Sequence, residues 1–100
     1  MTASLLNRAS ANSCVVNQNA LYTYTITTDN SLPNISGVCG GLWDNLKGFS
    51  ACSASATSCG AYGSGNVLRW EFTVPNICNS GDVEAAWWDA TTNNWGGISC

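Results

Sequence analysis

Histidine is absent from this chain of 100 residues. Without an imidazole, Ser-His-Asp, Cys-His and histidine-based ribonuclease chemistry are excluded. The cysteines form no C-x-x-C pair, and their closest spacing, Cys52 to Cys59, fits no common zinc pattern. We therefore predict that the protein holds no metal ion and needs no cofactor.

Charge is also scarce, with three basic and six acidic residues and a net charge of −3. The basic residues, Arg8, Lys47 and Arg69, are scattered singly, so no basic stripe can neutralise phosphates. Nucleic acid is excluded as a partner, and anionic membrane surfaces are disfavoured for the same reason. Because Asn, Ser, Thr and Gly supply most of the polar surface, we expect a neutral partner.

Long apolar runs are missing too. No run approaches the roughly 20 residues that a transmembrane helix needs, so we predict no membrane span. The opening "MTASLLNRAS" has only two consecutive leucines, whereas a signal peptide carries an apolar run of about 7–15 residues. We expect the chain to be the mature form of a secreted protein.

The carboxylates do not form an evident catalytic pair. A glycosidase needs two of them about 5 to 9.5 Å apart in a cleft. Asp82 and Glu84 are explained by the first turn of a predicted helix, and Glu71 lies beside Arg69 on a predicted strand. A domain of this size also has little room for a catalytic cleft. We predict that the protein is not an enzyme and has no catalytic residues.

Cysteine, in contrast, is abundant. An even number of cysteines spread along a short chain predicts a framework of three disulfides. Disulfides persist in oxidising compartments, which indicates an extracellular protein. In a secretory host, the sequon Asn34-Ile35-Ser36 is a predicted glycosylation site. The cysteines are Cys14, Cys39, Cys52, Cys59, Cys78 and Cys100.

Residues 1–13 carry no sustained hydrophobic period, and we predict a flexible N-terminal arm followed by one disulfide-rich domain over 14–100. Alternating residues predict strands in "LYTYTITT", 21–28, and in "VLRWEFTV", which follows the turn "GSGN". The small, polar stretch 51–62 fits an edge strand, and "WGGISC" is expected to form a short last strand.

Two helices are predicted. Apolar residues recur at helical spacing over 35–48, although three glycines weaken that pattern. The second helix starts after a cap at Asn79 or Ser80. Its buried stripe includes Val83 and Trp87, so Trp87 is expected to pack in the core and Trp88, about 100° round the helix, to lie outside it.

The order strand, helix, strand, strand, helix, strand predicts an α+β, two-layer sandwich. In this ferredoxin-like split βαβ arrangement (βαββαβ), two helices cover one face of a four-stranded antiparallel sheet. Six cysteines allow fifteen connectivities. The topology favours Cys14–Cys100, Cys52–Cys78 and Cys39–Cys59, because it brings the first and last strands, and the helix ends, together.

Five tryptophans in a chain with so little charge predict recognition of a sugar, whose C–H faces stack on indole rings. Trp70 and Trp87 are assigned to the core, which is also the default for any single tryptophan. The candidate ligand-binding residues are Trp88, Trp95, Asn93, Asn94, Asp89 and Trp43.

The outward side of the predicted sheet is a second candidate surface. A threonine-rich face is compatible with plain solvated sheet or with half of a homodimer, and the edge strand over 51–62 offers the same choice. This side carries Thr23, Thr25, Thr27, Arg69, Glu71 and Thr73.

In element order and cysteine placement, residues 14–100 resemble small cysteine-rich secreted proteins of fungi. Stretches such as "SCVVNQNALYTYTITT" and "VEAAWWDATTNNWGGISC" have the character of killer-toxin-like effectors and of a mushroom glycan-binding family. The resemblance implies a compact α/β sandwich with a first-to-last disulfide and a non-enzymatic role outside the cell.

Two functions follow as hypotheses. The first is a secreted, lectin-like protein that binds neutral glycans, on free carbohydrate or on a cell-surface glycoprotein, in defence or host interaction. The second is a killer-toxin-like or effector protein that acts on a membrane or a host protein. A dimerising role through the open sheet is a third alternative.

Overall fold

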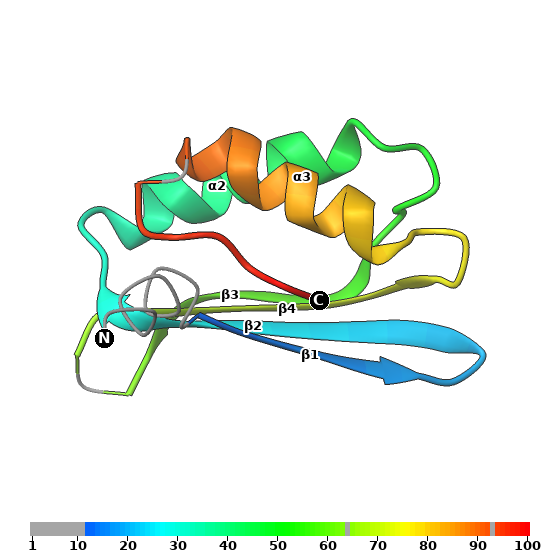
Figure 1. Ribbon diagram of the computed structural model, residues 1–100, viewed down its shortest axis with the longest axis horizontal. Helices are drawn as coiled ribbons and strands as arrows, with labels where there is room; N and C mark the ends of the chain where they lie inside the picture. The colour runs from blue at the N-terminus through cyan, green and yellow to red at the C-terminus, as the bar shows by residue number, and fades with distance from the viewer. Residues whose placement is uncertain (1–11, 64, 93) are drawn as a thin grey trace, which may run out of the picture.

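The computed structural model describes residues 12–63, 65–92 and 94–100. Two helices lie side by side on one face of an antiparallel sheet, and the other face of the sheet is open (Figure 1). The predicted α+β sandwich is confirmed. Its elements are β1 (Ser13–Gln18), β2 (Leu21–Ser31), α2 (Ile35–Lys47), β3 (Ser55–Tyr62), β4 (Val67–Pro75) and α3 (Ser80–Thr91).

The sheet has the strand order β1-β2-β4-β3, and every neighbouring pair is antiparallel. Alternate residues of β4 are buried, as the sequence pattern predicts for a strand covered on one side. Its buried residues, from Leu68 to Val74, meet Tyr24 and Ile26 of β2 beneath the helices. The rings of Tyr24 and Phe72 stack with centroids 5.5 Å apart.

One predicted strand is wrong. Residues 95–100 form no strand, and the place beside β2 is taken by β1, which was assigned to no element. A short connection joins β1 to β2, so their pairing closes only a small loop and costs little chain entropy. Gly96 adopts φ 83°, a left-handed conformation that interrupts an extended tail. The element order is therefore ββαββα.

The tail from residue 94 instead runs back from α3 toward the sheet (Figure 1). Asn12 holds it there, because its side-chain amide donates to the carbonyl oxygens of Trp95 at 2.9 Å and Gly97 at 3.2 Å. Its Oδ1 accepts from the Asp29 backbone N–H at 3.2 Å. Of the predicted arm, residues 1–11 lie outside the described residues, whereas Asn12 is buried and Ser13 opens β1.

Both predicted helices are present. Asn34 caps α2 and accepts a hydrogen bond from the Gly37 N–H, while Asn79 caps α3 and accepts one from the Asp82 N–H. A Cβ atom added to Gly41 would lie 3.6 Å from the Ala90 side chain, an ordinary van der Waals distance, so α2 and α3 pack against each other at this position without requiring a glycine there.

The two adjacent tryptophans of α3 point in different directions, as predicted. Trp87 is 1% exposed and its indole N–H donates to the carbonyl oxygen of Gly96 at 2.9 Å, whereas Trp88 is 55% exposed. The core lies between the buried stripes of the two helices and the inner face of the sheet.

All three predicted disulfides are confirmed: Cys14–Cys100, Cys39–Cys59 and Cys52–Cys78. The first pair was predicted from a last strand that does not exist. The Cys14–Cys100 bond forms nevertheless, because the tail returns to β1, and β1 takes the place in the sheet that was predicted for the last strand. The other two tie α2 to β3 and the segment after α2 to the segment before α3.

Candidate functional site

A pocket of about 630 Å³ opens beside the C-terminal half of α2. Its volume falls within the range of about 300–1,000 Å³ that is usual for small-molecule sites. Its walls come from the last turns of α2, from the segment that follows and from the start of β3. The lining residues are Trp43, Leu46, Lys47, Phe49, Ser50, Cys52, Ser53, Ala54 and Thr57.

Trp43 supplies the indole of this pocket. It follows the fully buried Leu42 and lies about 100° round the helix from it, so its ring falls at the margin of the core and is half-buried. Its ring lies 5.6 Å from that of Trp70 in an edge-on arrangement, and 6.1 Å from that of Phe72. The core therefore fixes the orientation of the indole, and one part of it remains available to the pocket.

The segment after α2 forms the opposite wall as a series of tight turns. The N–H of Phe49 donates to the carbonyl oxygen of Leu46 at 3.0 Å, and that of Cys52 donates to Phe49 at 2.9 Å. The disulfide from Cys52 to Cys78 then anchors the segment to the start of α3. The wall is thus held at both ends, and the pocket is built before any ligand arrives.

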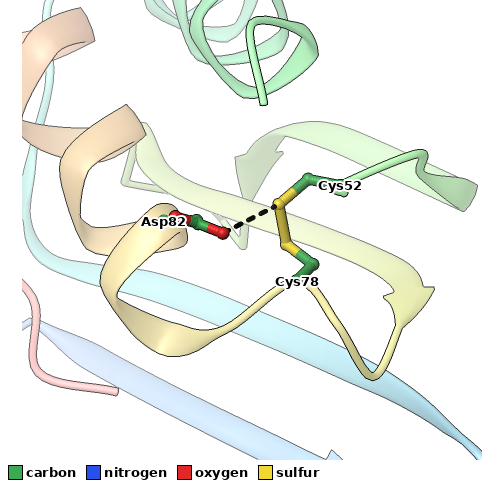
Figure 2. A group of neighbouring side chains, drawn as sticks. All are labelled: Cys52, Cys78 and Asp82. Carbon is green, nitrogen blue, oxygen red and sulfur yellow. Dashed lines mark hydrogen bonds between the residues drawn. A yellow bond between two sulfur atoms is a disulfide. The ribbon is translucent and has the colours of Figure 1, made fainter. Parts of the chain in front are cut away.

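Behind this wall, Cys52, Cys78 and Asp82 lie together, as Figure 2 shows. Their ligand atoms fall within 4.8 Å of one another, and Cys52 Sγ lies 3.8 Å from Asp82 Oδ2. A disulfide sulfur carries no proton to donate and is not a thiolate, so the oxidised trio cannot act as a two-thiolate metal site. Asp82 instead lies in the first turn of α3, where the helix dipole favours an anion.

The chemistry of the pocket is amphipathic. The rings of Trp43 and Phe49 provide apolar surface, and Ser50, Ser53 and Thr57 provide hydroxyl groups that can donate and accept hydrogen bonds. No Asp or Glu belongs to the described lining. Lys47 is its one charged residue, and its Nζ lies 3.6 Å from Asp44 Oδ1 at the exposed surface.

The residues predicted for ligand binding do not gather in one place. Trp43 lines the pocket, whereas Trp88 and Asp89 are exposed on α3 and belong to no described part of its lining. Asn94 is exposed and its side-chain amide donates to Thr92 Oγ1 at 3.0 Å. Trp95 is half-buried and packs against the core. Asn93 lies outside the described residues.

Asn34, the predicted glycosylation site, is exposed at the start of α2. Its Oδ1 accepts from the Gly37 N–H at 3.3 Å. The cap uses the oxygen of the side-chain amide, whereas a glycan would be attached to its nitrogen. The cap and the modification therefore do not compete for the same atom.

The open sheet face carries the predicted outward residues, and many of them bond one another. Thr23 Oγ1 lies 2.9 Å from Thr73 Oγ1, and Thr25 donates to Glu71 at 3.1 Å. The remaining carboxylate oxygen of Glu71 lies 3.7 Å from an Arg69 nitrogen. These cross-strand pairs occupy much of the polar capacity of the face, so the pocket is the better candidate for a ligand.

The sequence did not reveal most of the pocket residues. Phe49 has the helical spacing of the apolar residues in the first helix, but it follows Gly48, which caps that helix, so it cannot continue the buried stripe. Gly48 is also the helix stop that the sequence indicates, and it places Phe49 beyond the helix without showing that Phe49 lines a pocket. The hydroxyl residues of 50–57 stand in a small, polar stretch with no periodic pattern, so nothing local assigns them to a pocket.

No family model, no curated protein and no solved structure matches the chain.

Proposed function

We propose that the protein is a secreted, non-enzymatic recognition protein that binds a neutral glycan in the pocket beside α2. The observation that carries the proposal is the indole of Trp43 at the wall of a pocket lined by aromatic and hydroxyl side chains. The ring would pack against the C–H face of a sugar, and the hydroxyl groups of Ser53 and Thr57 would bond its hydroxyls.

The surrounding chemistry supports a binding role over catalysis. The described lining contains no carboxylate, whereas glycoside hydrolysis uses a pair of them. Two of the carboxylates outside the lining have structural partners: Glu84 accepts the backbone N–H of Cys100 at 2.8 Å, and Glu71 accepts from Thr25. A preformed pocket whose described lining has no pair of carboxylates to act as general acid and general base suits recognition.

An extracellular location is supported by the disulfides. Every cysteine of the chain is paired, and such bonds persist in oxidising compartments. No helix in the described parts of the chain is long and apolar enough to cross a membrane. The exposed sequon at Asn34 fits passage through a secretory pathway.

The test is a glycan array probed with the oxidised protein, followed by titration of the strongest neutral glycan. Trp43→Ala should weaken binding about tenfold or more, because an indole stacking contact contributes about 0.5–1.5 kcal/mol beyond its buried area. Trp88→Ala is the matched control, since it removes an identical ring from an exposed position on α3. It should leave the affinity unchanged.

Because Trp43 also packs on Trp70, thermal melting must show that Trp43→Ala is folded. Thr57→Val tests the site without touching the core: it removes one hydroxyl from an exposed lining residue and keeps the volume. Loss of binding in Trp88→Ala alone would move the site to α3. An array without any selective binding would overturn the glycan proposal.

The second candidate, a killer-toxin-like or effector protein, is favoured by a separate observation. Ile77 is 67% exposed in the connection after β4, and the exposed Leu21 lies at the same end of the sheet, where it pairs with Pro75. Exposed apolar groups of this kind suit a membrane or a host protein. Leakage from liposomes or growth inhibition that sugars do not compete, and that Ile77→Ser abolishes, would establish this function instead.

A further inference from the structure

The outer side of β1 is an open sheet edge. β1 pairs only with β2, at one end of the strand order. Among residues 12–63, 65–92 and 94–100, no further backbone hydrogen bond reaches it. The tail approaches β1 through the Cys14–Cys100 disulfide and not through its backbone.

The pairing of the β1–β2 hairpin shows which backbone groups point outward. At its tip, the N–H of Asn19 donates to the carbonyl oxygen of Leu21 at 3.1 Å. Hydrogen-bonded pairs alternate along an antiparallel ladder, so Asn17 and Val15 also bond β2. The N–H and C=O groups of Cys14, Val16 and Gln18 therefore point away from the sheet.

This edge lacks the features that normally prevent strand addition. All six residues of β1 stay in register with β2, and "SCVVNQ" contains no charge and no proline. The opposite edge strand, β3, is interrupted: its register shifts between Ser55 and Ser58, where Ala56 adopts a positive φ of 50°. Such a bulge distorts an edge and opposes pairing. The predicted edge interface over 51–62 is thus the less suitable one.

Charge and exposure at β1 suit a second copy of the same chain. Val15 is 54% exposed on the open face of the strand. Asp29 is the only charged residue of β2, and it lies beyond the paired region. Two copies can approach along β1 without bringing like charges together, and each would cover apolar surface of the other.

We propose that the protein forms a two-fold homodimer by antiparallel pairing of β1 with β1 of a second copy, centred on Val16. In this register Val16 bonds its own counterpart and Cys14 lies opposite the partner's Gln18, so each outward group meets an acceptor or a donor. The two sheets join into one, with their open faces on the same side.

The pockets would remain free in this dimer. Thr57, which lines the pocket, belongs to β3, at the other end of the strand order from β1. If the proposed glycan function holds, the dimer presents two pockets at its outer ends and gains avidity for a surface that displays many glycans. The dimer itself does not depend on that function.

The experiment measures mass and amide exchange on the full chain. Sedimentation equilibrium should give twice the mass of the chain at micromolar concentrations. In the dimer the amides of Val16 and Gln18 should exchange with deuterium about 100-fold more slowly than in dilute monomer, because each gains a hydrogen bond. The amides of Val15 and Asn17 are internal controls, since they bond β2 in either state.

Val16→Pro provides the decisive variant. The N–H of Val16 points outward, so proline at this position removes the central intermolecular donor and leaves the hydrogen bonds between β1 and β2 intact. It should sediment as a folded monomer, whereas Val16→Ala, which keeps the N–H, should remain a dimer. A wild-type monomer at all concentrations would overturn the proposal, and so would a dimer whose Val16 and Gln18 amides exchange rapidly. A monomer in which those two amides are slow would also overturn it, because their protection would then arise within one chain.

Discussion

At the scale of single residues, the two fully buried tryptophans differ in whether the indole N–H has a hydrogen-bond acceptor. The indole N–H of Trp87 donates to the carbonyl oxygen of Gly96, whereas that of Trp70 is buried without an acceptor among the described residues. A buried donor without a partner costs about 1–3 kcal/mol. Ring packing holds Trp70 in place, since the centroid of its ring lies 4.7 Å from that of Phe72 and 5.6 Å from that of Trp43.

This difference leads to a prediction. Trp87→Phe and Trp70→Phe both shrink a buried ring, but the first removes the 2.9 Å hydrogen bond to the Gly96 carbonyl oxygen, which then keeps only the 3.4 Å bond from Asn12, while the second removes an unsatisfied donor. Trp87→Phe should therefore lower the free energy of unfolding by about 1–3 kcal/mol more than Trp70→Phe. Urea denaturation of the two variants measures this. Equal losses, or a greater loss in Trp70→Phe, would contradict the hydrogen-bond argument.

At the scale of elements, the tail from residue 94 shows how a segment without regular structure is held. Its attachments include the Asn12 side chain, the bond from Trp87 to Gly96, the bond from the Cys100 N–H to Glu84, and the Cys14–Cys100 disulfide. The tail contributes Trp95 and Ile98 to the packing around the core. It thus performs the covering role expected of a last strand, without strand hydrogen bonds.

Asn12→Ala should destabilise the protein, because it removes the buried side-chain amide that donates to the carbonyl oxygens of Trp95 and Gly97 and so holds the tail. We expect a loss of about 1–3 kcal/mol in the free energy of unfolding. Hydrogen exchange should show faster opening of residues 95–100 at an unchanged rate for β4. Asn12→Asp keeps the acceptor for Asp29 but loses the donors, so it should behave like the alanine variant. A neutral Asn12→Asp would show that the acceptor alone matters.

At the scale of the whole molecule, the disulfides constrain chain segments of very different length. Cys14–Cys100 spans a sequence separation of 86 residues, whereas Cys39–Cys59 spans 20. On the loop-entropy model, a longer closed segment restricts the unfolded chain more. A domain of this size buries only about two-thirds of its surface, so it depends on such links.

Removal of the Cys14–Cys100 pair by double serine substitution should therefore cost about 4–5 kcal/mol, against about 3 kcal/mol for the Cys39–Cys59 pair. Guanidinium denaturation of the two double variants, with the remaining disulfides intact, gives the comparison. If the Cys39–Cys59 variant were the less stable one, native packing around α2 and β3 would outweigh loop entropy.

The sequence by itself determined what depends on local periodicity and composition: both helices, the two central strands, the inward Trp87 and outward Trp88, and the disulfide framework. These follow because alternation and helical spacing assign a face to each residue whatever its distant neighbours are. Tertiary structure alone decided that β1, and not the tail, completes the sheet, because both segments are short and the choice depends on loop closure and on attachments such as Asn12. It also decided the pocket, since Trp43, Phe49 and Thr57 come together only when the turns after α2 fold back under the Cys52–Cys78 disulfide.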